Sequence, residues 1–257
     1  MKEVIEFYNK YDEDNRLKSK THLPEYLITM KYIKKYLTPN SKILEIGAGT
    51  GRYSIALADM GYDITSVELV PHNIEILKSK IKTEHKIKVF EGNACDLSFI
   101  EDNTYDIVLL LGPMYHLFTK EDKVRALCEA KRVTKPGGII FVAYVMNEYS
   151  ILTYGFKQKH IAECVRDGRI SEEFQCMSAP SDLYDYVRIE QIDALNQEAG
   201  LERIKIITPD GPANYMRQVL NSLTEEEFEL FIQYHLSTCE RQDLIGAAAH
   251  TVDILRK

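Results

Sequence analysis

From residue 42 to residue 145 the sequence alternates between short apolar runs and longer segments whose apolar residues recur at helical spacing. The apolar runs cover residues 42–46, 63–67, 87–90, 105–111 and 138–145. Strands joined by helices in this way form a parallel sheet with right-handed crossovers. The run 105–111 is so continuously apolar that both of its faces have to be covered, which places helices on both sides of the sheet.

Two later apolar runs, 201–208 and 250–256, add strands to this core. The sequence therefore predicts an α/β fold with a doubly wound, mostly parallel seven-stranded sheet and helices on both faces. Outside the alternating region we expect two helices within 1–38, one over 149–167, one over 189–198 and one of about 14 residues capped by Thr224. The expected parts are an N-terminal helical cap (1–40), a ligand-binding core (41–146), a helical insertion that covers the site (147–187) and the C-terminal part of the core with an added helix (188–257).

Charge and cysteine content restrict the class of protein. A net charge of −7 speaks against a broad nucleic-acid-binding surface. Five cysteines, none in a CxxC pair, fit no disulfide framework, so we expect a cytoplasmic location. The acidic, amphipathic start is unlike a signal peptide, and no run approaches about 18 uncharged apolar residues, so we expect no membrane involvement. We also expect no bound metal.

The first apolar run leads directly into a glycine-rich loop, Gly47-Ala48-Gly49-Thr50-Gly51. Open parallel sheets bind ligands at the carboxyl ends of their strands, where the strand order reverses. Glycine lets the backbone turn sharply and approach a ligand without an intervening Cβ. The helix that follows begins with backbone N–H groups that have no partner inside the helix. This loop therefore predicts a site for a nucleotide-like ligand.

Two familiar cofactor loops do not fit this segment. The dinucleotide fingerprint GxGxxG needs its third glycine where this chain has Arg52, and Gly51 comes one residue too early. A phosphate-binding P-loop needs Gly-Lys followed by Ser or Thr, which is also absent. An oxidoreductase with a similar sheet therefore stays a minor alternative.

The remaining pattern, a strand followed by Glu-x-Gly-x-Gly-x-Gly, resembles the first motif of the class I S-adenosylmethionine (AdoMet)-dependent methyltransferases. The resemblance covers residues 40–145 and places four motifs in the expected order and spacing. It implies AdoMet as the cofactor and methyl transfer to another molecule. The four motifs are Glu45-Ile46-Gly47-Ala48-Gly49-Thr50-Gly51, Glu68, Glu91-Gly92-Asn93-Ala94-Cys95-Asp96-Leu97 and Leu110-Leu111-Gly112-Pro113-Met114-Tyr115-His116-Leu117.

The resemblance implies a role for each motif. Glu68, 17 residues after Gly51, would accept hydrogen bonds from the ribose hydroxyls; the alternative is a solvated loop acid. Asn93, where the family usually has Asp, would accept from the adenine amino group. Glu45 would lie near the methionine part, the alternative being a structural ion pair, because a buried charge needs a partner. The cofactor contacts expected from these motifs are Glu45, Gly47, Ala48, Gly49, Gly51, Glu68, Leu69, Asn93, Ala94, Cys95, Leu111 and Gly112.

Tyr115 and His116 follow the fourth strand and are the candidate catalytic residues. His116 can act as a base or hydrogen-bond the substrate, and Tyr115 can contact the methionine part or the substrate. The alternative is that His116 packs locally with its ring nitrogens satisfied. Gly112 replaces the amide or acid of the Asn/Asp-Pro-Pro-Tyr motif found in methyltransferases that act on amino groups of bases and glutamine, which disfavours that subclass.

The segment before the first strand combines aromatic and charged residues. In small-molecule methyltransferases of this type, helices at this place often cover the cofactor. Tyr11 would then cover the methionine end and Arg16 would reach its carboxylate; a solvated amphipathic helix is the alternative. Tyr149, Tyr154, Tyr184 and Tyr186 are candidates for a substrate pocket, or else pack at the surface.

We therefore expect a methyltransferase that acts on an oxygen or nitrogen atom of a small-molecule acceptor. An enzyme acting on RNA or protein is the first alternative; it would need a basic patch, and the local lysine clusters are too ordinary to indicate one. A catalytically silent AdoMet-binding sensor or partner protein is the second. The sequence identifies neither the acceptor nor the oligomeric state.

Overall fold

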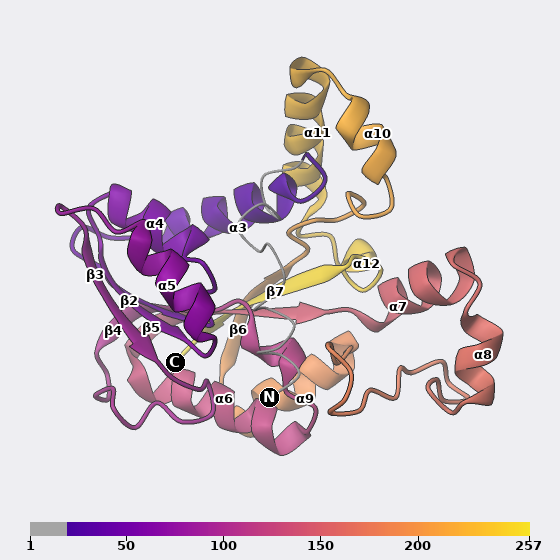
Figure 1. The fold of residues 1–257 in the computed structure, drawn as a ribbon, viewed down its shortest axis with the longest axis horizontal. Helices are drawn as coiled ribbons and strands as arrows, with labels where there is room; N and C mark the ends of the chain where they lie inside the picture. The colour runs from indigo at the N-terminus through magenta and orange to yellow at the C-terminus, as the bar shows by residue number, and fades with distance from the viewer. Residues whose placement is uncertain (1–19) are drawn as a thin grey trace.

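A computed structural model describes residues 20–257 of the chain. The strands form one seven-stranded sheet with the order β3-β2-β1-β4-β5-β7-β6. Helices wrap around this sheet (Figure 1). The order reverses between β1 and β4, which is where open parallel sheets bind ligands. The strands are β1 (Lys42–Ile46), β2 (Asp63–Glu68), β3 (Lys86–Glu91), β4 (Tyr105–Leu110), β5 (Thr134–Val145), β6 (Glu202–Ile207) and β7 (His250–Arg256).

Strands β1 to β5 pair in parallel, whereas β7 runs antiparallel to both of its neighbours, β5 and β6. The predicted doubly wound, mostly parallel sheet of seven strands is therefore confirmed. The direction of β7 has a consequence for the site. Because β7 is reversed, its first residue, His250, lies at the same sheet edge as the carboxyl ends of the parallel strands.

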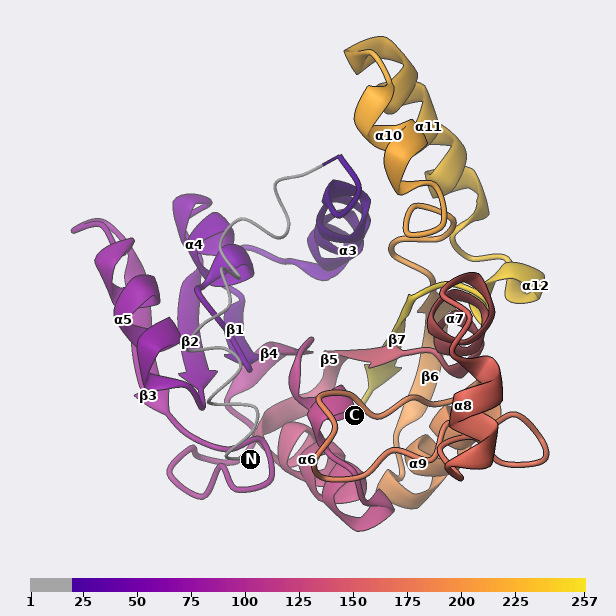
Figure 2. The ribbon, with the colours of Figure 1, turned by 45° about the vertical axis from the view of Figure 1, so that its right-hand side comes forward.

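Two apolar layers cover the sheet. Alternate residues of each strand point to opposite faces, and neighbours such as Ile43 and Leu44 therefore belong to different clusters. One cluster joins the sheet to α3 (Leu23–Tyr36) and α4 (Arg52–Asp59), and the other joins it to α6 (Lys120–Val133) and α9 (Ile189–Ala199). Figure 2 shows these two helix pairs on opposite sides of the sheet. A further helix, α5 (Pro71–Ser79), begins at a proline, as expected for a first helical position.

Some expected boundaries move. Strand β5 begins at Thr134, because that residue pairs with Tyr105 before the register shifts ahead of Ile139. The helix expected over 149–167 is divided into α7 (Asn147–Ser150), a π-helical stretch η2 (Ile151–Lys157) and α8 (Ile161–Arg166). The break lies at Lys159, whose positive φ of 66° ends regular helix. The first of the two helices expected before residue 38 lies outside the described residues.

The remaining helical segments are the short η1 (Pro113–His116), α10 (Arg217–Ser222) and α12 (Gln242–Ile245), and the longer α11 (Glu225–Thr238). Thr224 and Glu227 form the expected capping box at the start of α11. In both ribbon views α10 and α11 stand side by side, away from the sheet. Within residues 20–257 no helix is long and apolar enough to cross a membrane.

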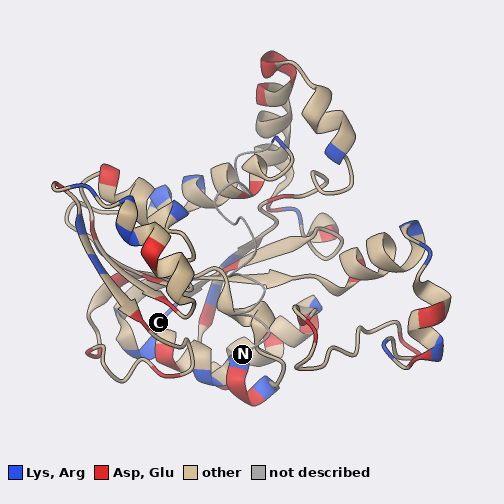
Figure 3. Cartoon of the chain, in the orientation of Figure 1, with Lys and Arg blue, Asp and Glu red and all other residues tan. Residues whose placement is uncertain are grey.

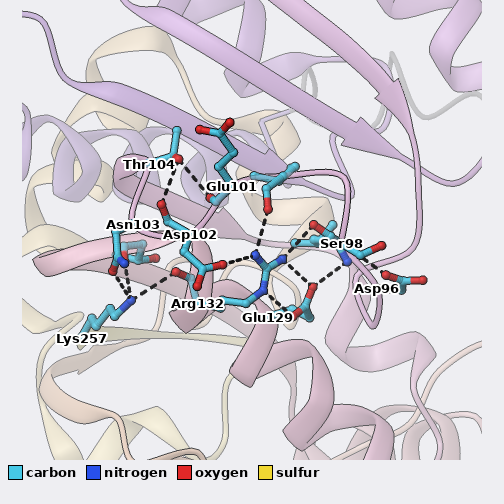
Figure 4. Close-up of polar contacts among 12 residues, drawn as sticks. Asp96, Ser98, Glu101, Asp102, Asn103, Thr104, Glu129, Arg132 and Lys257 are labelled. Carbon is cyan, nitrogen blue, oxygen red and sulfur yellow. Dashed lines mark hydrogen bonds and ion pairs between the residues drawn. The ribbon is translucent and has the colours of Figure 1, made fainter.

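The connection between β3 and β4 is held against α6 by Arg132 (Figure 4). Its guanidinium donates to the carbonyl oxygens of Leu97 and Ile100 (both 2.8 Å). It also pairs with Asp102 (2.6 Å) and Glu129 (2.8 Å). Because this connection begins with Gly92 and Asn93, the ion-pair network fixes one wall of the cavity described next.

Candidate functional site

A cavity opens at the carboxyl edge of the sheet, where the strand order reverses between β1 and β4, and most of the predicted residues line it. It is bounded by the loops after β1, β2, β3 and β4, by α3, and by the ends of β5, β6 and β7. Most of the residues expected to contact the cofactor or the substrate line it: Glu45, Gly47, Ala48, Gly49, Glu68, Leu69, Asn93, Ala94, Leu111, Gly112, Tyr115 and His116.

Two predicted cofactor residues lie outside the lining. A Cβ added at Gly51 would come within 2.1 Å of Leu77 on α5, so this glycine allows a helix to pack closely. Cys95 directs its thiol to the carbonyl oxygen of Asp122 (3.4 Å). Tyr11 and Arg16 are outside the described residues, so their roles stay predictions.

The glycine loop owes its shape to backbone contacts. Gly47 has φ +74°, a conformation that side chains disfavour, and a Cβ there would meet the Pro113 ring at 2.6 Å. The N–H groups of Gly47 and Ala48 both donate to the carbonyl oxygen of Val67, at 2.8 and 3.1 Å. The loop is thereby pinned between β2 and the segment after β4.

Glu68 is buried at the end of β2 and connects two loops. Its carboxylate accepts from the N–H groups of Gly49 (2.7 Å) and Val70 (2.9 Å), and from the Asn73 side-chain amide (3.3 Å). It is therefore not the solvated acid of the alternative interpretation. The Asn73 Oδ1 atom lies in the same wall, buried and without a hydrogen-bond partner among the described residues.

Glu45 is buried on β1 and has no basic partner within the described salt bridges. The Ser54 hydroxyl donates to its carboxyl group, and the Ser54 and Ser66 hydroxyls lie 2.7 Å apart. Burial raises the pKa of Glu45 to about 8, although the Ser54 contacts oppose this shift. The structural ion pair considered as an alternative is therefore not what holds this acid.

Asn93 begins a tight turn after β3. Its Oδ1 accepts from the Cys95 N–H (3.0 Å), which is the local side-chain-to-backbone bond that favours Asn in turns. An amide oxygen has a second lone pair. The side chain lines the cavity, so the turn presents a polar edge to a ligand.

His116 lies between the cavity and the insertion. Its Nδ1 donates to the carbonyl oxygen of Leu183 (2.8 Å), and its ring packs near Tyr115 and Tyr184, with centroids 4.8 and 5.4 Å away. Burial lowers the pKa of His116 to about 4, so the ring is neutral near pH 7. In this tautomer Nε2 carries the lone pair and can accept a hydrogen bond.

The insertion is anchored beside this histidine. Asp185 donates its N–H to the carbonyl oxygen of Tyr115 (2.8 Å) and pairs with the buried Lys123 of α6 (2.6 Å). Of the four tyrosines considered for a substrate pocket, Tyr154, Tyr184 and Tyr186 line a second cavity inside the insertion. Tyr149 instead packs on Tyr215, with centroids 5.3 Å apart.

The cavity also contains residues that the sequence analysis did not single out. Arg52, considered only as a break in the dinucleotide fingerprint, places its guanidinium 4.4 Å from the centroid of Tyr26. Asn73 had no motif. Glu25, Thr29, Pro209, His250 and Val252 come from α3 and from the segments around β6 and β7. Pro209 follows the carboxyl end of β6, and the reversed direction of β7 brings His250 and Val252 to the same edge.

Comparisons with known proteins agree with this arrangement. Residues 44–142 match the family model described as a methyltransferase domain. The demethylmenaquinone methyltransferase of Staphylococcus haemolyticus (strain JCSC1435) is 26% identical over 210 residues, 77% of this chain and 83% of that protein. The enzyme of the same name from Renibacterium salmoninarum is 33% identical over 117 residues, 46% of this chain and 45% of that protein. The chain spans about half the length of several curated relatives that it matches.

A solved structure from Thermotoga maritima, described as a SAM-dependent methyltransferase and possible histamine N-methyltransferase, has the same fold. The two chains superpose with a TM-score of 0.59 and 22% identity, covering 100% of this chain and 99% of that one. At this identity the likeness shows the fold alone.

Proposed function

Because this chain carries a methyltransferase domain on the class I AdoMet-dependent fold, with AdoMet as the cofactor of that family, we propose that it methylates an oxygen or nitrogen atom of a small molecule. The observation that carries the proposal is the convergence of four sequence motifs on one cavity at the strand-order reversal. When bound, AdoMet supplies a methyl group that is attached to a positively charged sulfur atom. After transfer of the methyl group, this sulfur becomes part of a neutral thioether.

The residues in the cavity fit AdoMet chemically. Asn73 Oδ1 is a buried acceptor that needs a donor, and it lies beside the Glu68 carboxylate. Two neighbouring acceptors suit the two hydroxyls of a ribose. Gly112 leaves space between the Gly47 carbonyl oxygen and the Tyr115 hydroxyl, which a Cβ would approach to 3.4 and 3.7 Å. This space joins the glycine loop to the candidate catalytic residues.

We assign the methionine end of the cofactor to Glu45 and Arg52. Arg52 begins α4, so its guanidinium and the helix N-terminus both favour a carboxylate. Glu45 is buried near the end of β1, just before the glycine loop, and its carboxylate suits an ammonium or sulfonium cation. This division places the adenine at Asn93 and the methyl group toward Tyr115 and His116.

His116 and Tyr115 then orient the acceptor. Methyl transfer needs the nucleophile, the methyl carbon and the sulfur in line, and such positioning can supply about 7–11 kcal/mol. A pKa of about 4 makes His116 a weak base at neutral pH, which favours hydrogen bonding to the substrate over proton removal. Its ring is held for that task by Leu183 and Tyr184.

A small acceptor is supported by the charge distribution and by the relatives. Figure 3 shows lysines and arginines interspersed with acids over the described helices and strands, rather than gathered on one face. RNA-binding enzymes need a concentrated basic surface. Two relatives are named for a quinone-type small molecule.

Calorimetry with AdoMet, S-adenosylhomocysteine and NADH in parallel tests the cofactor assignment. We expect the first two to bind and NADH not to bind; binding of NADH alone would refute the proposal. Transfer of a labelled methyl group is then measured on phenols, amines and quinols, with tRNA and protein as comparison acceptors. Transfer only to the macromolecules would replace the small-molecule assignment, and tight AdoMet binding with no transfer would favour a sensor.

Proton release on AdoMet binding tests the role of Glu45. Because burial raises its pKa to about 8, the free protein holds this carboxyl group largely protonated at pH 7. A nearby cation favours the carboxylate, so we expect binding to release nearly one proton at pH 7. The release should fade above pH 8, where the group is already ionised. The measurement is the dependence of the binding enthalpy on the ionisation enthalpy of the buffer.

Two variants make this measurement specific. Glu45→Gln should bind AdoMet without releasing the proton, whereas Glu84→Gln, which alters an exposed acid, should release it like the wild type. Equal proton release by the wild type and by Glu45→Gln would show that Glu45 does not contact the cation of the cofactor.

A further inference from the structure

A second histidine faces the cavity, on a side that none of the four motifs supplies. His250 is the first residue of β7, and Asp210 lies in the loop that follows β6. The His250 Nδ1 donates to Asp210 Oδ2 at 2.7 Å, and the His250 backbone N–H donates to Asp210 Oδ1 at 3.2 Å. One carboxylate therefore holds both the backbone and the ring of the same histidine.

We propose that His250, held by Asp210, is the general base that takes the proton from the methyl acceptor. This inference rests on the proposed methyl transfer and deepens it, because it restricts the acceptor to a hydroxyl or amine that must lose a proton. His250 is a catalytic residue in this assignment, and Asp210 is a positioning residue.

The surroundings of Asp210 suit a fixed negative charge. Its side chain is fully buried, yet it also accepts from the Asn214 side-chain amide at 2.7 Å. Hydrogen-bond donors therefore reach both carboxylate oxygens and fix the orientation of the carboxylate. A buried carboxylate that accepts from Nδ1–H fixes the tautomer in which Nε2 carries the lone pair, and it stabilises the imidazolium that forms when Nε2 takes a proton.

The position of His250 in the sheet matches the acceptor side of the cavity. The cofactor motifs follow β1, β2, β3 and β4, whereas His250 and Val252 belong to β7, beyond β5 in the strand order. His250 pairs with Val145 at the carboxyl end of β5. Glu25 of α3 approaches the same ring, with 3.9 Å between its Oε2 and Nδ1, and adds negative charge beside the imidazole. Both side chains line the cavity.

The two cavity histidines thus have different environments. His116 donates to a neutral carbonyl group, and burial lowers its pKa to about 4. His250 donates to a carboxylate and keeps 21% of its side chain exposed, which allows a proton to pass to solvent. A carboxylate partner stabilises the imidazolium that forms when Nε2 takes a proton, whereas the carbonyl group bonded to His116 carries no such charge. This contrast favours His250 for proton removal and His116 for orientation.

The proposed step is balanced. The acceptor oxygen or nitrogen forms a bond to the methyl carbon, and the carbon–sulfur bond breaks with its electron pair going to sulfur. The acceptor proton moves to His250 Nε2, and the resulting imidazolium faces the Asp210 carboxylate. Loss of this proton to water restores the neutral ring without any further reactant.

Nitrogen NMR of histidine-labelled protein tests the arrangement without any turnover. We expect the His250 signals, identified by their loss in His250→Ala, to show a protonated Nδ1 and an unprotonated Nε2 in the neutral ring. Asp210→Asn should abolish this fixed tautomer, whereas Asn214→Ala, which removes one neighbour of the carboxylate, should retain it. A wild-type ring protonated on Nε2 would overturn the proposal, since that nitrogen could not accept a proton.

The role of His250 as a base is tested by enzyme kinetics with the acceptors that the wild type methylates. We expect His250→Ala to lower kcat about 10²- to 10⁴-fold, the usual contribution of a general base, while AdoMet affinity changes less than about threefold. Asp210→Asn should lower kcat in the same direction. His85→Ala is the matched control, because it removes a His–Asp pair (3.0 Å to Asp59) that is not part of the cavity, and it should retain wild-type kcat.

The results of these experiments distinguish the role of His250 as a base from the proposed methyltransferase function. If the wild type transfers the methyl group and His250→Ala has the same kcat, this inference is overturned and the proposed function still stands. Absence of transfer by the wild type to every acceptor would remove the proposed function and this inference with it. Each variant is also examined by calorimetry with AdoMet and by thermal melting. These measurements identify variants that are inactive because they are unfolded rather than because the base is missing.

Discussion

We expect Gly112→Val to weaken AdoMet binding at least about 100-fold, or roughly 2.7 kcal/mol, while the protein stays folded. The backbone at this position has φ −130°, which any residue adopts, and a Cβ meets only ordinary contacts at 3.4 Å or more. The valine methyl groups would enter the space between the glycine loop and Tyr115 that we assign to the cofactor. The affinity is measured by calorimetry, and stability by thermal melting.

Gly246→Val is the matched control for this substitution. Gly246 has a helical φ of −65°, lies outside the cavity and has nothing within 4 Å of an added Cβ. It should bind AdoMet as the wild type does. If Gly112→Val also retained wild-type affinity, the cofactor would have to lie elsewhere. The glycine-loop positions are less suitable for this test, because Gly47 has a positive φ and its substitution strains the backbone by itself.

The largest effect on stability is expected from Arg203→Met. Arg203 on β6 makes two hydrogen bonds of 2.7 Å to Asp253, which is fully buried on β7 and also accepts from Asn196 (2.6 Å). Burial raises the pKa of Asp253 above its ordinary value, and the guanidinium opposes that shift. Removal of one partner of a buried ion pair typically costs about 3–5 kcal/mol, because an uncompensated charge stays buried. The measurement is the free energy of unfolding in denaturant.

Two further variants test whether the buried, uncompensated carboxylate of Asp253 causes this loss of stability. Arg256→Met removes an exposed ion pair of 3.8 Å to Glu202 between the same two strands, and we expect a loss below about 1 kcal/mol. Adding Asp253→Leu to Arg203→Met should recover much of the lost stability, because apolar replacement of a whole buried pair is often neutral. Equal losses in Arg203→Met and Arg256→Met would mean that burial of the carboxylate is not the cause.

Much of the core could be predicted because each element repeats a local signal. The strands at 42–46 and 105–111 were recognisable from their apolar runs, and Pro71 and Thr224 marked the starts of helices. The insertion was harder. Its apolar residues keep helical spacing through 149–167, but a left-handed residue at Lys159 divides the segment, and nothing local distinguishes a π-helical stretch from an α-helix.

The cofactor half of the site was predictable for a related reason. Its residues lie at or directly after the ends of individual strands, and the resemblance to the methyltransferase motifs singled out Glu68 and Asn93 at those positions. Arg52 is the first residue of α4 and Asn73 the third residue of α5, and neither carries a recognisable motif. Their participation depends on how α4 and α5 pack against the sheet.

The part of the cavity that β7 supplies could not be predicted, because it depends on strand direction. The last apolar run was correctly placed at 250–256, yet a sequence pattern does not tell a parallel strand from an antiparallel one. A parallel strand would have carried His250 to the opposite edge, about 20 Å away for seven residues. Only the reversal of β7 brings it to Asp210, 40 positions earlier in the chain.

The contact between Asp210 and His250 also closes a loop. The residues between them include α10, α11 and α12, and both ends of this excursion meet at one carboxylate. Loop closure depends only weakly on loop length, so each doubling of the excursion costs about 0.6 kcal/mol. The excursion is therefore a place where the chain can gain, lose or exchange whole helices while the proton acceptor and the cofactor loops keep their geometry.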